Sequence, residues 1–273
     1  MTGCVGPYQV SAEEELIIAL AHGVLGFGNP AGVPIFVDYF NGVAAHLRRA
    51  GHTVIAPQVN PVGTVVQRGE QLAAAILARV PGDQRIHVIA HSMGGLDARH
   101  AITHVADVAE RVATLVTIGT PHRGSPVADA IAGRADPLLE HIPRFIVDQL
   151  QRNAGALDEL TTVIARRFDD ATPDMEGVRY IEVAGDASLG GQELLLFRLS
   201  AAIGRLTGEI NDGVVTKWSA HRDGNEHLAD WPVDHAGEIG WSLANPVPLD
   251  VELPFIPASA HLRRYVAIVS ALE

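Results

Sequence analysis

The sequence feature that most constrains the fold is the hexapeptide Ala90-His91-Ser92-Met93-Gly94-Gly95. An apolar, β-branched run at residues 85–89 precedes it, and a helix-forming run at residues 96–102 follows it. A serine between a strand and a helix, with small residues two positions away on each side, is typical of a sharp turn that holds an exposed nucleophile in strained backbone. The short pattern alone also occurs by chance. It indicates a nucleophile only because a strand is expected before it and a helix after it.

The chain has 273 residues, of which 47% are hydrophobic, enough for one large α/β domain with a complete core. Strand-like apolar runs alternate with stretches of helical period. This alternation predicts a mostly parallel central sheet with helices on both faces. We therefore expect a single domain over residues 1–273.

The strands expected from this pattern cover residues 16–21, 53–59, 85–89, 112–118, 178–184 and, as a short last strand, 213–216. Helices are expected at residues 38–50, 65–80, 96–102, 192–206 and 260–272. From residue 125 to residue 172 the alternation stops and apolar residues recur at helical spacing. We interpret residues 125–172 as a helical lid over the site, with an ordinary extra helical layer as the alternative.

The formal net charge of −12 argues against nucleic acid and against an anionic membrane, because no basic patch is present to meet phosphates. No apolar run approaches the roughly 20 residues that span a bilayer.

Cys4 is the one cysteine, so no intrachain disulfide can form. No basic segment followed by an apolar one is visible at the N-terminus. We expect a cytoplasmic protein, or a mature secreted form whose leader has been removed.

A serine hydroxyl is a poor nucleophile unless a base takes its proton and an acid orients that base. In folds with such a strand–turn–helix nucleophile, the chain order is serine, acid, histidine. After Ser92, the best acid is Asp212, which lies at an Asn-Asp-Gly turn late in the sheet. The main alternative is Asp186, directly after the strand expected at residues 178–184.

The base is expected on a loop near the C-terminal end of the sheet, where the candidates are His221, His227, His235 and His261. We favour His235, which precedes a short helix, and we place His227 second. His261 falls in the last helix, and a side chain on a long rigid helix is poorly placed to reach the serine. His221 lies too close to the expected last strand to fold back.

An oxyanion needs backbone N–H donors. One comes from Met93, the residue after the nucleophile. The other is expected from Val24, in the loop after the first strand, where Gly23 lets the backbone turn its amides toward the serine. We expect His22 to brace this loop rather than to act as a base.

Taken together, these motifs resemble the bacterial true lipases of the α/β-hydrolase superfamily, whose secreted members are often calcium-dependent. The segments that carry the resemblance span most of the chain and cover residues 22–27, 38–42, 68–72, 90–95, 118–125, 211–215 and 234–239. Residues 68–72 and 120–125 are more specific than the turn around the serine. The resemblance implies Ser92, Asp212 and His235 as the catalytic triad, with Val24 and Met93 as oxyanion donors.

The chain departs from this family in three ways. The resemblance implies a calcium-binding aspartate two residues after the catalytic histidine, but this position is Gly237, and the neighbouring Glu238 corresponds to a different family position. The single cysteine excludes the disulfide of secreted relatives, and we expect no leader like theirs at the start of this sequence. The histidines and aspartates of residues 221–235 lack a short fixed histidine spacing. We therefore expect no metal and no cofactor.

These observations predict a serine hydrolase that cleaves carboxylic esters of medium or long acyl chains, as a lipase or an esterase. A thioesterase, an acyltransferase or a polyester depolymerase on the same triad is the alternative. A non-catalytic binding protein is the least favoured reading. The expected partner is a lipid or small-molecule ester, with transient contact of the lid with a lipid interface.

Overall fold

The computed structural model describes residues 15–24, 38–82, 84–133, 136–142, 147, 151, 154–190, 196–241 and 260–272. Within these residues the chain forms a six-stranded sheet with the order β2-β1-β3-β4-β5-β6. All five strand pairs are parallel. The strands are β1 Ile17–Ala21, β2 Thr53–Ile55, β3 Ile86–His91, β4 Val112–Ile118, β5 Arg179–Val183 and β6 Glu226–His227.

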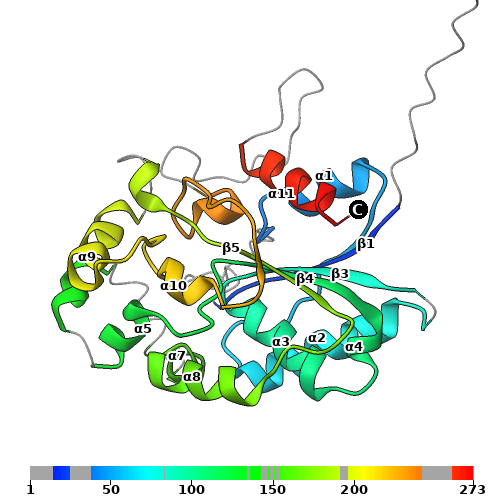
Figure 1. Cartoon of the computed structure of the whole chain (residues 1–273), viewed down its shortest axis with the longest axis horizontal. Helices are drawn as coiled ribbons and strands as arrows, with labels where there is room; N and C mark the ends of the chain where they lie inside the picture. The colour runs from blue at the N-terminus through cyan, green and yellow to red at the C-terminus, as the bar shows by residue number, and fades with distance from the viewer. Residues whose placement is uncertain are drawn as a thin grey trace, which may run out of the picture.

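Helices cover both faces of this sheet (Figure 1). The two helices α1 (Val43–Arg49) and α11 (Ala260–Ser270) lie together on one face. The other face carries α2 (Val65–Arg79), α3 (Met93–His104) and α4 (Val108–Arg111). The remaining helices are α5 Pro126–Ile131, α7 Ala154–Glu159, α8 Thr162–Ala171, α9 Phe197–Thr207 and α10 Lys217–Ala220, with 3-10 turns η1 Asp136–His141, η2 Ala187–Leu189 and η3 Gly237–Ile239.

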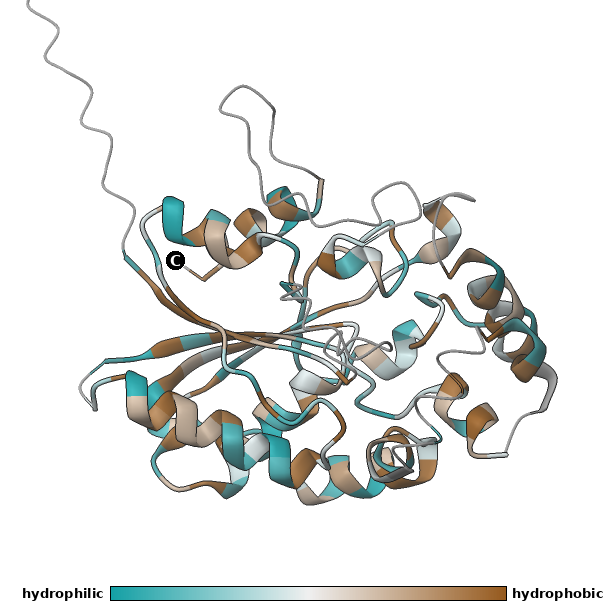
Figure 2. Ribbon diagram, turned by 180° about the vertical axis from the view of Figure 1, so that it is seen from behind, coloured by the Kyte–Doolittle hydropathy of each residue, from teal (hydrophilic) through white to brown (hydrophobic). Residues whose placement is uncertain are grey.

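The hydrophobic core lies on both faces of the sheet, which explains why its strands are apolar at nearly every position (Figure 2). Along β1, Ile18 and Leu20 pack into the cluster shared with α1 and α11. Ala19 and Ala21 pack into the cluster shared with α2 and α3. Each fully buried isoleucine or leucine stabilises the fold by about 1.5–3 kcal/mol. The predicted parallel sheet covered on both faces is confirmed.

The prediction of a short last strand at residues 213–216 is wrong, because these residues form a turn. Asp212 Oδ1 accepts hydrogen bonds from the Val214 and Val215 amides at 2.8 and 2.7 Å, so the chain turns there instead of extending. The sixth strand is β6, which lies further along the chain at a position where no strand was expected, and it pairs with β5. Val215 is buried against Ala184 and Ala220, which explains why this segment is apolar.

The helix expected at residues 38–50 begins later, at Val43. The carboxylate of Asp38 accepts hydrogen bonds from the Phe40 and Gly42 amides at 3.1 and 2.8 Å, which favours a turn over a helix. Asn41 and Gly42 then adopt left-handed backbone, with φ of 48° and 88°. The helix can begin only after these two residues.

The segment at residues 125–172 contains α5, η1, α7 and α8 and no strand in its described part. The start of α8 packs closely on the core: a Cβ on Gly124 would lie 2.4 Å from Thr162 Cα. Residues 134–135, 143–146, 148–150 and 152–153 of this segment, and residues 191–195 of the helix expected at 192–206, lie outside the described residues. Of the described helices, none combines the length and the apolar character that crossing a membrane requires.

Candidate active site

Ser92 lies between the last residue of β3 and the first residue of α3. Its backbone has φ 57° and ψ −133°, a conformation that a residue with a side chain rarely adopts. The serine is buried, with 6% of its surface exposed. The strained turn expected from the sequence is therefore present.

Close contact between α3 and β1 explains the glycine two residues after the serine. A Cβ on Gly94 would lie 2.4 Å from the Ala21 carbonyl oxygen and 2.8 Å from that of His22. Ala90, two residues before the serine, is completely buried. Only small side chains fit on both sides of this turn, as the motif predicts.

A chain of hydrogen bonds joins Ser92, His235 and Asp212. Ser92 Oγ lies 3.0 Å from His235 Nε2, and His235 Nδ1 lies 2.8 Å from Asp212 Oδ2. With a carboxylate facing it, Nδ1 carries a hydrogen and donates, so that Nε2 of the neutral ring accepts from the serine hydroxyl. The sequence-predicted serine, acid and histidine, which span 143 positions of the chain, are thus brought together.

The turn at Asp212 fixes the acid and the base relative to each other. Besides the amides of Val214 and Val215, Asp212 contacts the histidine segment through its main chain, since the His235 amide donates to the Asp212 carbonyl at 2.8 Å. Burial raises the pKa of the Asp212 carboxyl, while the His235 imidazole and the Val215 amide act in the opposite direction.

The alternative acid and bases lie in other contacts. Asp186 Oδ1 accepts from the amide and hydroxyl of Ser188 at 2.9 and 2.5 Å. His227 Nε2 donates to the Arg222 carbonyl at 3.0 Å, and the ring stacks on His221 at 4.1 Å between centroids. His261 Nε2 lies 2.8 Å from the Asn41 carbonyl.

The expected oxyanion donors border the serine. Met93 is the first residue of α3, where backbone N–H groups have no partner within the helix. A Cβ on Gly23 would lie 2.7 Å from Ser92 Cβ, so the backbone just before Val24 passes directly beside the serine. Val24 is partly buried, and residues 25–27 of the same motif lie outside the described residues.

Two buried side chains brace this loop. Arg68 Nη2 donates to the His22 carbonyl at 2.7 Å, and Nε donates to Asp97 Oδ2 at 2.8 Å. His22 Nε2 accepts from the Val59 amide at 3.1 Å. Burial lowers the pKa of His22 to about 4, so its ring stays neutral and suited to that role. This arrangement agrees with the bracing role expected for His22 and explains the arginine of the motif at residues 68–72.

Sequence reasoning missed a second carboxylate at the histidine. Glu238 is fully buried, and its Oε2 lies 3.3 Å from His235 Nδ1 and 2.9 Å from His91 Nε2. His91 Nδ1 in turn lies 2.7 Å from the Tyr39 hydroxyl. The spacing of three residues between His235 and Glu238, across one turn, is the signal that could have indicated this contact.

The charges around His235 favour its protonated form. Burial lowers its pKa, but the carboxylates of Asp212 and Glu238 outweigh burial and raise it above the ordinary value. Burial holds the pKa of His91 well below its ordinary range, so the two adjacent imidazoles differ in charge preference. An arrangement of this kind activates a hydroxyl group as a nucleophile and stabilises the imidazolium that forms.

The residues present do not fit a calcium ion of the kind the family resemblance implies. A Cβ on Gly237 would lie 2.9 Å from Val233 Cβ, so a carboxylate has no room there. The two oxygens of Asp234 accept from the amides of Gly237 and Leu196 at 2.8 and 2.7 Å. Among the described residues, one group of three ligand-type side chains lies within 4.8 Å, namely His91, His235 and Glu238. Two imidazoles and one carboxylate do not suit a hard cation that needs six or more oxygens.

Comparison with known proteins identifies the family to which the chain belongs. A model of the PGAP1-like alpha/beta domain family matches residues 57–167. The triacylglycerol lipase of Pseudomonas fragi is 30% identical to this chain, over 86% of the chain and 93% of that protein. The chain belongs to the triacylglycerol lipase family of the α/β-hydrolases. The triacylglycerol lipase of Vibrio cholerae serotype O1 is 29% identical over 83% of the chain and 80% of that protein. A member of this family is a carboxylic ester hydrolase.

Solved structures show the same fold. The lipase of Staphylococcus hyicus superposes with a TM-score of 0.67 at 16% identity, over 99% of this chain and 98% of that one. The mature Bacillus licheniformis lipase BlEst2 superposes with a TM-score of 0.66 at 24% identity, over 82% of this chain and 86% of that one. The α/β-hydrolase fold of this lipase-family chain is therefore shared with both.

Proposed function

We propose that this lipase-family enzyme hydrolyses carboxylic esters of medium to long acyl chains through Ser92, His235 and Asp212. The observation that carries the proposal is the unbroken contact from Ser92 Oγ to His235 Nε2 at 3.0 Å and from Nδ1 to Asp212 at 2.8 Å. A nucleophile, a base and an orienting acid within hydrogen-bond distance are the requirements of acyl transfer to serine.

In this mechanism Ser92 Oγ attacks the acyl carbon while His235 Nε2 takes the hydroxyl proton. The amides of Met93 and Val24 stabilise the negative oxygen of the tetrahedral intermediate. His235 then gives its proton to the leaving alcohol, and an acyl-enzyme remains on Ser92. The same imidazole then takes a proton from water, which attacks the acyl carbon. The bond between the acyl carbon and Ser92 Oγ breaks, the imidazolium returns the proton to Oγ, and the acid is released. Asp212 keeps the hydrogen on Nδ1 throughout and stabilises the imidazolium.

An apolar cluster beside the serine supports an acyl substrate. Met93 and Leu96 at the start of α3 pack with residues of α5, η1, α7 and α9, and Val24 and Val214 border the same cluster. The relatives from Pseudomonas fragi and Vibrio cholerae, which carry the name triacylglycerol lipase, are consistent with a lipid ester.

We further propose that residues 125–172 form the cap over this site and contact a lipid interface during turnover. The described helices of the cap contribute Val127, Leu138 and Leu157 to the apolar cluster. Val163, on α8, has 48% of its surface exposed, which leaves an apolar side chain available to a lipid.

The test is hydrolysis of p-nitrophenyl esters from acetate to palmitate by the enzyme and by Ser92→Ala. We expect the variant to lose about 10⁴-fold or more of the activity while its unfolding temperature stays the same, because only the nucleophile is removed. The parent enzyme should be fastest with chains longer than acetate. Full activity of Ser92→Ala would refute the mechanism, and a maximum at acetate would refute the substrate class.

A further inference from the structure

The segment at residues 119–125, directly after β4, contacts the nucleophile turn at one end and the acid turn at the other. Near its start, Thr120 Oγ1 donates to the Ser92 carbonyl at 2.9 Å. At its end, Ser125 Oγ donates to the Val214 carbonyl, in the turn that carries Asp212, at 2.6 Å. The sequence of this segment is one of the more specific parts of the family resemblance, but the proposed mechanism gives it no role.

Ser92 needs restraint because its backbone conformation is unfavourable. A residue held at φ 57° and ψ −133° relaxes unless its surroundings fix both of its peptide groups. On the amino side, the Ser92 amide donates to the Ile118 carbonyl at 2.9 Å. On the carboxyl side, the Ser92 carbonyl accepts from the Gly95 amide at 3.1 Å and from the Thr120 hydroxyl at 2.9 Å. Thr120 thus supplies a side-chain restraint on the second peptide group.

The first turn of α3 is built around the Thr120 side chain. A Cβ on Gly95 would lie 2.2 Å from Thr120 Oγ1 and 2.7 Å from its Cγ2, so this position of the helix has to lack a side chain. Thr120 is completely buried. Its hydroxyl is therefore directed at the Ser92 carbonyl by close packing on all sides.

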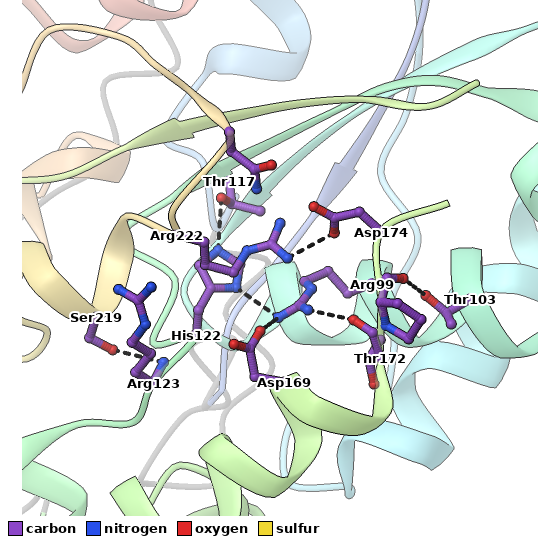
Figure 3. Close-up of polar contacts among 12 residues, drawn as sticks. Arg99, Thr103, Thr117, His122, Arg123, Asp169, Thr172, Asp174, Ser219 and Arg222 are labelled. Atoms are coloured by element: carbon purple, nitrogen blue, oxygen red, sulfur yellow. Dashed lines mark hydrogen bonds and ion pairs between the residues drawn. The ribbon is translucent and has the colours of Figure 1, made fainter. Parts of the chain in front are cut away.

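The segment that carries Thr120 is fixed by His122, whose contacts with Arg99 and Thr117 are drawn in Figure 3. The His122 amide donates to the Thr120 carbonyl at 2.9 Å. Its Nδ1 accepts from Arg99 Nη1 at 3.3 Å, and its Nε2 therefore carries the hydrogen and donates to Thr117 Oγ1 at 3.1 Å. The ring is fully buried, and burial and the guanidinium of Arg222 hold its pKa well below the ordinary range. His122 stays neutral and fixes the loop from both ring nitrogens.

We propose that Thr120 is a positioning residue for the nucleophile: its hydrogen bond to the Ser92 carbonyl fixes the strained peptide and so directs Oγ at His235 Nε2. The proposal rests on the proposed function of Ser92. A displacement of about 1 Å at the reacting atom costs roughly 100-fold in rate. Loss of this hydrogen bond should therefore lower the rate of acylation without changing how the substrate binds.

The test compares Thr120→Val, which keeps the shape but lacks the hydroxyl, with Thr120→Ser, which keeps the hydroxyl. Thr103→Val is the matched control, because the Thr103 hydroxyl also donates to a backbone carbonyl, that of Pro173, at 3.0 Å, and Thr103 lies at the far end of α3 from Ser92. Each variant is assayed for kcat and KM with a p-nitrophenyl ester and for the rate of Ser92 phosphonylation by a fluorophosphonate. Thermal unfolding reports the structural cost.

We expect Thr120→Val to lose about 10- to 100-fold in both kcat and phosphonylation rate, with KM changed less than about twofold. Thr120→Ser should recover most of the loss, and Thr103→Val, which also loses a hydrogen bond from a hydroxyl to a carbonyl, should keep the parent rates. If Thr120→Val does not fold, Thr120→Ala gives the same comparison, since it removes the hydroxyl without adding a methyl group.

Equal rates for Thr120→Val and Thr103→Val, or a loss confined to KM, would overturn the positioning role. This outcome is distinct from failure of the proposed function. Failure of the function requires Ser92→Ala to remain active, whereas failure of the present inference requires an inactive Ser92→Ala together with a fully active Thr120→Val.

Discussion

Two carboxylates face the imidazole of His235, and in the proposed mechanism this arrangement sets the pH range of activity. Asp212 Oδ2 lies 2.8 Å and Glu238 Oε2 3.3 Å from Nδ1. Both negative charges stabilise the imidazolium and raise the pKa of His235 against the opposing effect of burial. Since only the neutral ring can take the serine proton, the active form is present above this raised pKa and is lost as the pH falls through it.

We predict that kcat/KM rises with pH through an apparent pKa above the ordinary histidine value of 6.5. Glu238→Gln should move this acid limb to lower pH, because it removes a negative charge that favours the protonated ring. The measurement is the pH dependence of kcat/KM for a p-nitrophenyl ester.

The control for this prediction is Glu226→Gln. Glu226 pairs with Arg179 on the surface, where both side chains are 44% exposed, and it lies on β6 away from His235. The acid limb of the kcat/KM profile of Glu226→Gln should coincide with that of the parent enzyme. An unchanged limb in Glu238→Gln would show that the second carboxylate has no influence on the base.

At the scale of elements, the site depends on how closely α3 approaches β1. Gly94 lies on the first turn of α3, where an added Cβ would come within 2.4 Å of the Ala21 carbonyl oxygen. Backbone atoms at the end of a central strand cannot move aside as a flexible side chain would. The close approach of α3 to β1 therefore depends on glycine at position 94.

We predict that Gly94→Ala lowers the free energy of unfolding by about 1–3 kcal/mol, because overpacking forces α3 away from the sheet. Gly204→Ala is the matched control. Gly204 lies inside α9, and its nearest neighbour to an added Cβ is Asn211 Nδ2 at 3.7 Å. There alanine should raise the free energy of unfolding by about 0.5–1 kcal/mol. Urea-induced unfolding measures both, and a neutral Gly94→Ala would contradict the account.

At the scale of the whole molecule, a buried polar network joins the proposed cap, residues 125–172, to α3, which begins directly after Ser92 (Figure 3). Arg99 of α3 is 2% exposed and pairs with Asp169 of α8 at 2.7 Å. It also donates to the Thr172 carbonyl at 2.6 Å and to His122. The C-terminal part of the cap is therefore fixed to the same helix that begins at the nucleophile turn.

We predict that Arg99→Met lowers the free energy of unfolding by about 1–3 kcal/mol, because it leaves the buried Thr172 carbonyl and His122 Nδ1 without their donor. Arg179→Met is the control, since the exposed pair of Arg179 with Glu226 contributes about 0–1 kcal/mol. Urea-induced unfolding separates the two. Equal losses in both variants would show that the network does not hold the cap segment.

Most of the sheet could be predicted from the sequence because its strands are buried on both faces and read as continuous apolar runs. The segment at residues 213–216 misled this reasoning: Val215 is apolar for burial, while the Asp212 side chain caps the local amides and forms a turn. The start of α1 was misplaced for the same reason, because the Asp38 carboxylate competes with the helix for backbone amides. Hydrogen bonds from short polar side chains to nearby backbone amides decide where such elements begin and end. The periodicity of apolar residues does not indicate these hydrogen bonds.

The chain order of serine, acid and histidine led to three residues that the fold brings into contact. The chain order does not indicate the two contacts of His91, with Glu238 and with Tyr39. They join segments 147 and 52 positions apart through packing that only the folded chain creates. Likewise, the role of Thr120 depends on the strained carbonyl of Ser92, which no sequence pattern displays.

The most direct test of the central claim is where, and how fast, an alkyl fluorophosphonate reacts with the folded enzyme. Peptide mass spectrometry should find the adduct on Ser92, and His235→Gln should react at least about 100-fold more slowly, since the hydroxyl then has no base. An adduct on another residue with full loss of activity, or an equal rate in His235→Gln, would contradict the claim that His235 activates Ser92.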